Sequence, residues 1–138
     1  MRVHVLDANA LYRFVKGGPG DNVVAQLFKQ ARDLDQPLRM CIVNWGEVYY
    51  TIAKTEGFAE TATIMNRVRL LPLLVLDANE DLTVRAAQLK AGHGLPYADC
   101  FAAALTGKDE ILVTSDVKDF KKIRGLHILP LPAHRAKN

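Results

Sequence analysis

Short apolar runs that alternate with longer segments of helical spacing are the feature that most constrains this fold. The runs at residues 2–6, 38–43, 73–76, 111–114 and 127–129 are expected to be strands. Between them, apolar residues three and four positions apart predict helices over 22–33, 45–56 and 82–90, and the almost wholly apolar segment 97–105 is expected to be a further helix. Parallel strands need connections long enough to contain a helix. The pattern therefore predicts an α/β fold with helices on both faces of a mostly parallel sheet of about five strands.

Length and composition indicate one globular domain over residues 1–138. The chain is 49% apolar and 24% charged, and 138 residues can bury a core without disulfides or a structural metal. A glycine-rich break at residues 17–20 separates the first helical piece from the second. The basic end at 130–138 contains two prolines and is expected to be a frayed tail.

Cysteine usage and hydropathy bear on location. Cys41 and Cys100 lie in apolar contexts without a zinc-binding spacing, which indicates buried reduced thiols and a cytoplasmic protein. There is no pattern of a signal peptide and no apolar run of membrane-spanning length, so no membrane association is expected. The net charge of +3 is mild and indicates no more than tolerance of polyanions.

Four carboxylates in apolar surroundings are the candidate functional residues. Most acidic residues of this chain lie among other charges, but four do not: Asp7, Glu47, Asp99 and Asp116. Three of them, Asp7, Glu47 and Asp116, follow predicted strands, and the carboxyl ends of parallel strands form the ligand crevices of open sheets. Two carboxylates about 4 Å apart repel by roughly 4 kcal/mol at an effective dielectric near 20, so the set calls for a cation. Oxygen ligands without a Cys or His cluster favour Mg²⁺ or Mn²⁺ over zinc.

Helix starts offer an alternative explanation for the same acids. The candidates for this role are Asp7 as a cap, Asn44 with Glu47 and Asp116 with Asp119 as capping boxes, and Asp99 shortly after Pro96. The two explanations are compatible, because a helix N-terminus also favours the ionised form of a carboxylate.

The four motifs together resemble the PIN-domain family, and specifically the VapC-type toxins of toxin–antitoxin pairs. The resemblance rests on LDANAL, NWGEVYY, LPYADCFAAAL and ILVTSDVKDF, in this order, and extends over residues 2–129. It implies a three-layer α/β/α sandwich and an endoribonuclease that cleaves RNA phosphodiester bonds with metal-activated water. It also implies one or two Mg²⁺ or Mn²⁺ ions at the four acids.

Further roles follow from the resemblance by position. Asp119 corresponds to an occasional extra metal ligand and Thr114 to the supporting hydroxyl residue, while Ala8 stands where the family often has Ser or Thr, so that Asn9 is expected to take over its polar role. Basic residues expected near the same edge are candidates for binding RNA phosphates: Arg13, Lys16, Lys118, Lys121, Lys122 and Arg124. Trp45 and Tyr97 are candidates for stacking a base, although core packing is the preferred explanation for Trp45.

The resemblance also implies partners, and the sequence leaves two other functions to consider. A small antitoxin and a homodimer are expected. A receiver or phosphatase-like domain fits poorly, because Asn9 stands two residues after Asp7 where such a phosphatase has a second acid. The main alternative is a PIN-like module that binds RNA or protein without cleaving it. The RNA target is not encoded in any of these motifs.

Overall fold

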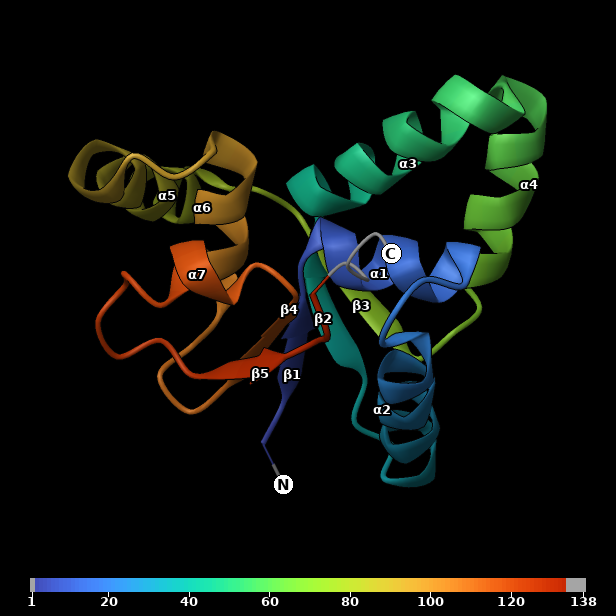
Figure 1. Ribbon diagram of the computed structural model, residues 1–138, viewed down its shortest axis with the longest axis horizontal. Coiled ribbons are helices and arrows are strands. Elements are labelled where there is room, and N and C mark those ends of the chain that lie inside the picture. Colours follow the sequence, from blue (N-terminus) through green and yellow to red (C-terminus); the bar gives the residue numbers. More distant parts are fainter. Residues whose placement is uncertain (1, 134–138) are drawn as a thin grey trace, which may run out of the picture.

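A computed structural model describes residues 2–133, which form three layers around one parallel sheet (Figure 1). The strands lie in the order β3-β2-β1-β4-β5 and all neighbouring pairs are parallel. Their bounds are β1 His4–Leu6, β2 Leu38–Cys41, β3 Leu73–Leu76, β4 Ile111–Thr114 and β5 Ile128–Pro130. The predicted α/β class and the five-stranded parallel sheet are confirmed within the described residues.

Helices cover both faces of this sheet. They are α1 Ala8–Lys16, α2 Asp21–Asp33, α3 Ile42–Glu56, α4 Phe58–Val68, α5 Glu80–His93, α6 Tyr97–Leu105 and α7 Val117–Phe120. One face of the sheet is covered by α1, α2, α4 and part of α3. The other face is covered by α5, α6 and α7 (Figure 1). None of the described helices is both long enough and apolar enough to cross a membrane.

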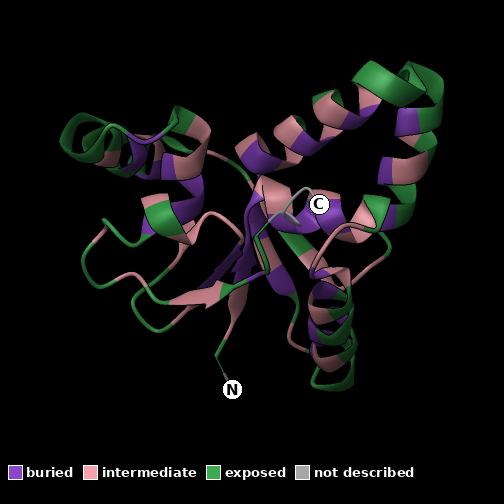
Figure 2. Ribbon diagram, viewed as in Figure 1, coloured by how far each residue is buried: buried purple, intermediate pink, exposed green. Residues whose placement is uncertain are grey.

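Alternation along the central strands divides the core between the two faces. Leu6 and Val113 pack with α1 and α2, whereas Val5 and Leu112 pack with α6 and α7. Successive strand residues point to opposite faces, so continuous apolar runs are needed where both faces are covered. Figure 2 shows the central strands β2, β1 and β4 largely buried, the edge strands β3 and β5 mostly intermediate, and the turn between α3 and α4 exposed.

Several predicted boundaries differ from the structure by one to three residues, among them the boundary between β2 and α3. The expected strand 38–43 ends at Cys41, and Ile42 already begins α3. A short apolar run has the same composition in a strand as in a buried helix, so its spacing cannot separate the two.

The helix α4 was not predicted. Its buried stripe consists of Thr61, Met65 and Val68, and the first of these is polar. Thr61 can be fully buried because its hydroxyl donates to the carbonyl of Gly57 at 2.6 Å. A polar residue thus occupies one of the buried positions, so the apolar pattern of the segment is incomplete and does not predict the helix.

The tail beginning at residue 130 was expected to be frayed, and this is wrong for its first residues. Pro130 belongs to β5, Leu131 is 3% exposed in the core beneath α1 and α2, and the carbonyl of Pro132 accepts a hydrogen bond from Arg13. Gly20 has φ +85, and a Cβ there would lie 2.9 Å from Pro132, so this packing requires a glycine in α2's N-cap position. Residues 134–138 of the predicted tail lie outside the described residues.

Candidate active site

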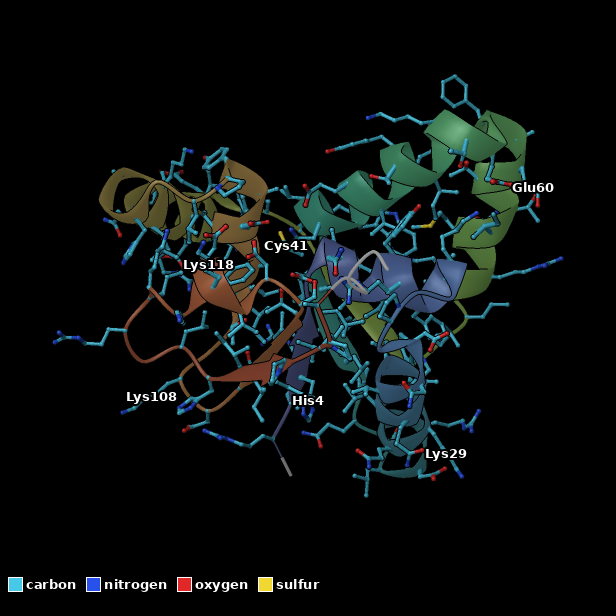
Figure 3. The ribbon with its side chains drawn as sticks, viewed as in Figure 1. His4, Lys29, Cys41, Glu60, Lys108 and Lys118 are labelled. Carbon is cyan, nitrogen blue, oxygen red and sulfur yellow. The ribbon has the colours of Figure 1, made fainter. Side chains whose placement is uncertain are left out.

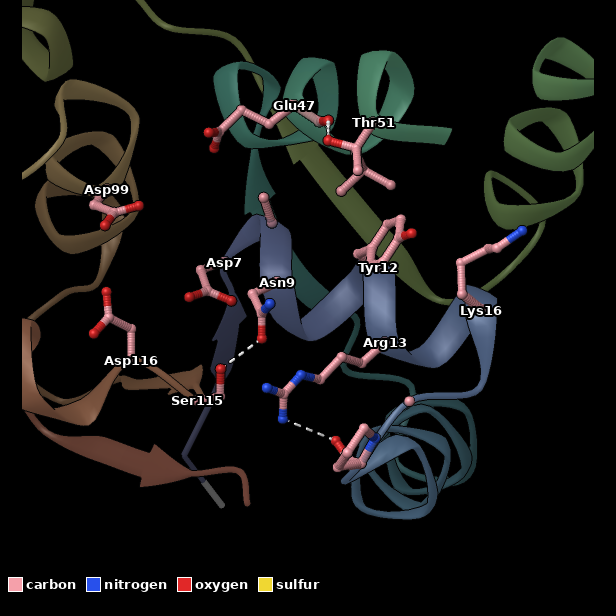
Figure 4. A pocket seen from close by; sticks show the side chains of 14 residues that line it. Asp7, Asn9, Tyr12, Arg13, Lys16, Glu47, Thr51, Asp99, Ser115 and Asp116 are labelled. Carbon is pink, nitrogen blue, oxygen red and sulfur yellow. Dashed lines mark hydrogen bonds between the residues drawn. The ribbon is translucent and has the colours of Figure 1, made fainter. Parts of the chain in front are cut away.

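A pocket of ≈ 470 Å³ lies at the carboxyl ends of the central strands, and all four predicted acids line it (Figure 4). From β1 the chain continues to β2 and β3 on one side, and later adds β4 and β5 on the other. The boundary between β1 and β4 is therefore the point at which strand order reverses, where open parallel sheets bind ligands. Asp7 directly follows β1, and Asp116 follows β4 by two residues.

The acid at the end of β1 is the most deeply buried of the four. Asp7 is 4% exposed and caps α1, because its Oδ1 accepts the backbone N–H of Ala10 at 2.8 Å. Its Oδ2 accepts the hydroxyl of Thr114, and the Thr114 Oγ in turn accepts the backbone N–H of Asp116 at 3.0 Å. Leu6 at the end of β1 pairs with Val113 of β4, and the residues that follow these two are Asp7 and Thr114. The register of the two strands therefore places Asp7 beside Thr114. Thr114 therefore links two of the acids through one hydroxyl group.

Asn44 orients a third acid, and the sequence interpretation missed this function. Asn44 is fully buried, and its amide donates to Glu47 Oε1 at 3.2 Å and to the carbonyl of Ala98 at 3.0 Å. It thus joins α3 to the residue before Asp99 on α6. The expected capping box is wrong, because Cys41 occupies the N-cap position of α3. Helical spacing revealed the pairing of Asn44 with Glu47 but not the contact with a segment 54 residues away.

The other helix-start explanations have mixed outcomes. Asp99 lies in the first turn of α6, after an N-cap at Pro96, as expected. Asp116 occupies the N-cap position of α7 as expected, and its carboxyl group interacts with the backbone and side chain of Asp119, although its side chain makes no regular capping hydrogen bond. Beside Ala8, the side chain of Asn9 accepts a hydrogen bond from Ser115 at 2.6 Å. Asn9 therefore joins α1 to the end of β4 at the pocket wall.

Burial and, after it, neighbouring negative charges raise the pKa values of Asp7, Asp99 and Asp116. Burial raises the pKa of Asp7 from 3.8 to about 6, against the opposing hydrogen bonds from Thr114 and Ala10. Burial, followed by the charges of Asp7, Glu47 and Asp116, raises the pKa of Asp99 to about 7. The pKa of Asp116 is also raised, mainly by burial and then by the charge of Asp119. The pocket is thus an environment in which added positive charge would be favourable.

The donor set suits a hard divalent cation in chemistry and in position. Carboxylate oxygens are the ligands that Mg²⁺ and Mn²⁺ prefer, and here they face one pocket from four separate elements of the fold. Within residues 2–133, no three acidic, histidine or cysteine side chains converge closely enough to form a metal centre. The residues present fit such an ion by ligand type and by the pocket that they share, whereas the described side chains are too far apart to hold it in this arrangement.

The remaining candidates are distributed unevenly around the pocket. Arg13 and Lys16 line it. Asp119 instead forms an ion pair with Lys122 at 3.6 Å, and its charge reaches the pocket through its effect on Asp116. Four predicted phosphate-binding residues are exposed on and after α7 and do not line the pocket: Lys118, which Figure 3 labels, and Lys121, Lys122 and Arg124.

The two aromatic residues considered for base stacking and the two cysteines lie in different surroundings. Trp45 packs against the core, as preferred, with the guanidinium of Arg69 5.1 Å from its ring centroid. Tyr97 is 46% exposed at the start of α6. Cys41 and Cys100 are buried free thiols whose pKa values are raised by burial, which disfavours the nucleophilic thiolate.

Comparison with known proteins identifies the class. A sequence model of the PIN domain matches residues 4–126, so the chain belongs to the PIN domain family. No curated protein resembles the chain closely enough to count as a match.

Solved structures share the fold. The chain is similar to one in the DNA-bound VapBC complex of Salmonella typhimurium, with TM-score 0.76, 18% identity and coverage of 94% of this chain and 98% of that one. It is also similar to a chain of VapBC2 from Rickettsia felis bound to a promoter DNA fragment, with TM-score 0.71, 18% identity and coverage of 93% and 98%. A toxin–antitoxin complex from Klebsiella pneumoniae contains another, with TM-score 0.62, 20% identity and coverage of 91% and 95%.

Proposed function

We propose that this PIN domain is a metal-dependent endoribonuclease and the toxin of a toxin–antitoxin pair. The observation that carries the proposal is the convergence of four carboxylates on one pocket, where burial and then neighbouring negative charges raise the pKa values of Asp7, Asp99 and Asp116. Such an arrangement is costly for folding, and a functional site that binds a cation accounts for its presence.

In this proposal the four acids bind one or two Mg²⁺ or Mn²⁺ ions. Asp7, Glu47, Asp99 and Asp116 are the ligands, with Asp119 as an additional candidate near Asp116. A bound divalent ion lowers the pKa of water and stabilises negative charge on a phosphoryl group, which is the chemistry of phosphodiester hydrolysis.

The surrounding residues keep the acids in place and are candidates for contact with the substrate. Thr114 fixes Asp7 relative to Asp116, and Asn44 fixes Glu47 relative to α6. The four exposed basic residues of α7 and the segment after it are proposed to contact RNA outside the pocket.

The toxin assignment and the partners are supported by the structural relatives, which occur in VapBC and toxin–antitoxin complexes. We infer a small antitoxin as partner, a homodimer in solution and a cytoplasmic location. Between α1 and α4 a groove of ≈ 400 Å³ offers an apolar surface on which a segment of the antitoxin could pack, lined by Phe14, Val15, Ile64, Val68 and Leu71, with Lys16 and Arg67.

The nuclease is tested with antitoxin-free protein and total cellular RNA in Mg²⁺, Mn²⁺ or EDTA. Discrete fragments are expected with either metal and not with EDTA, and they should disappear in Asp7→Asn and Asp99→Asn. Asp81→Asn is the matched control, because Asp81 is 80% exposed on α5, away from the pocket. RNA that stays intact in the presence of folded protein, but binds equally in EDTA and Mg²⁺, would favour the second candidate, a PIN module that does not cleave.

The partners have separate tests. Co-purification with a small protein encoded by a neighbouring gene would support the antitoxin. A sedimentation mass near the 15.3 kDa of one chain at micromolar concentration would contradict the homodimer.

A further inference from the structure

The pocket has two ends of opposite charge, and the proposed chemistry uses only the acidic one. Figure 4 shows the four acids toward one side, and Tyr12 and Lys16 toward the other, with Arg13 extending beneath them. Tyr12, Arg13 and Lys16 are spaced by one and three residues, so one face of α1 presents all three. Because Asp7 caps the same helix, α1 extends from the acidic end toward the other, which we call the cationic end.

Arg13 is a buried cation without an acidic partner among the described residues. It is 3% exposed, and its Nη1 donates to the carbonyl of Pro19 at 3.1 Å and to that of Pro132. Within residues 2–133 its buried Nε has no hydrogen-bond partner, and none of the ion pairs there involves Arg13. Burial of an unneutralised guanidinium is costly. Its positive charge therefore contributes to the potential of the pocket instead of cancelling a local acid.

Lys16 brings a second positive charge to the same end and remains accessible. Its side chain is 35% exposed, and its Nζ lies 3.2 Å from Oε2 of Glu56, which is itself partly exposed. A phosphate group could replace this carboxylate as the partner of Lys16.

The length of α1 separates the two ends by more than the size of one phosphate group. At a rise of 1.5 Å per residue, the nine steps from Asp7 to Lys16 span about 13.5 Å. This span leaves room for two phosphates of one strand, one near the acids and one near Lys16. The volume of ≈ 470 Å³ is that of a small-ligand pocket, which is large enough for part of a single strand.

We propose that the cationic end, formed by Tyr12, Arg13 and Lys16, binds a neighbouring phosphate of a single-stranded RNA whose scissile phosphate lies at the acids. This inference rests on the proposed nuclease function and assigns the path of the RNA strand, which follows α1 from the acids to the cationic end. Lys16 contacts the phosphate, Arg13 is a positioning residue that supplies charge and secures the pocket wall at Pro19, and Tyr12 offers a ring for base stacking.

The test measures binding of a labelled single-stranded oligonucleotide by fluorescence anisotropy across a series of salt concentrations. The proteins carry Asp99→Asn so that the strand is not consumed. Lys16→Met is expected to weaken binding roughly fivefold, as for loss of one partly exposed charge contact. It should also make the slope of log K against log salt less steep by about 0.7, the value for one phosphate contact on a single strand.

Two matched variants separate this effect from general changes in charge or stability. Lys29→Met removes the same charge from the exposed surface of α2 (Figure 3) and should leave both quantities unchanged. Glu56→Gln breaks the same ion pair but retains the lysine, so its binding should be equal or tighter. An unchanged slope in Lys16→Met would overturn the proposal. It would do so even if Lys16→Met weakened the binding of a protein partner, because Lys16 would then serve a protein interface and not an RNA phosphate. Absence of cleavage by the parent protein would refute the nuclease function separately, because the binding series does not depend on cleavage.

Discussion

Replacement of Asp7 by asparagine should stabilise the metal-free protein at neutral pH. Asp7 is 4% exposed, and burial raises its pKa from 3.8 to about 6. Between these two values the folded state binds more protons at Asp7 than the unfolded state, so the contribution of Asp7 to the free energy of unfolding decreases as pH rises through this window and levels off above about pH 6. Asparagine lacks this titration, so the variant should lose less stability than the parent protein in the same range.

The magnitude follows from the pKa shift and the hydrogen bonds. A shift of roughly two pKa units corresponds to about 3 kcal/mol at pH 7. Asparagine keeps an oxygen that can accept the N–H of Ala10, but the hydroxyl of Thr114 loses its carboxylate acceptor, which costs about 1 kcal/mol. The net gain is about 2 kcal/mol, or roughly 8 °C in Tm for a domain of this size. Near pH 4 only the cost remains, so the stability curves of the two proteins should cross between pH 4 and 6.

The assay is urea unfolding in EDTA from pH 4 to 8, with Asp81→Asn as the exposed control. Addition of Mn²⁺ at pH 7 should stabilise the parent protein much more than Asp7→Asn, because the variant lacks one of the proposed ligands. A variant less stable than the parent at every pH, or a difference independent of pH, would refute the argument that Asp7 is a desolvated charge.

Three further changes test other parts of the site. Thr114→Val should cost about 1–3 kcal/mol in urea unfolding. It should also raise the pKa of Asp7 above about 6 in an NMR titration, since the hydroxyl now favours the ionised carboxylate; an unmoved pKa would contradict this hydrogen bond. The affinity for Mn²⁺, measured by calorimetry, should fall as pH drops below about 7, because a proton on Asp99 competes with the ion, whereas equal affinity at pH 6 and 8 would argue against Asp99 as a ligand. Arg13→Met should lower the free energy of unfolding by about 2 kcal/mol, because two backbone carbonyls lose their donor; unchanged stability would show that these bonds contribute little.

The sequence by itself determined the fold class and the four acids that line the pocket. Runs such as 73–76 and 111–114 are strands at the predicted residues, and α6 covers the predicted range. The order of apolar and polar residues along the chain encodes these features, because strands and helices bury side chains at different intervals. The acids were identifiable for a related reason, since a charged residue directly after an apolar run has few local explanations.

Only the tertiary structure decided how these acids are supported. The contact of Thr114 with Asp7 spans 107 residues, that of Asn44 with Ala98 spans 54, and that of Arg13 with Pro132 spans 119. Each depends on the order and register of the strands or on the packing of helices against them, and spacing along the chain contains neither. The same dependence explains why the sequence predicts a frayed tail for the segment after β5, which in fact is packed. Leu131 is buried only because β5 pairs with β4 and directs it beneath α1, which no local pattern reveals.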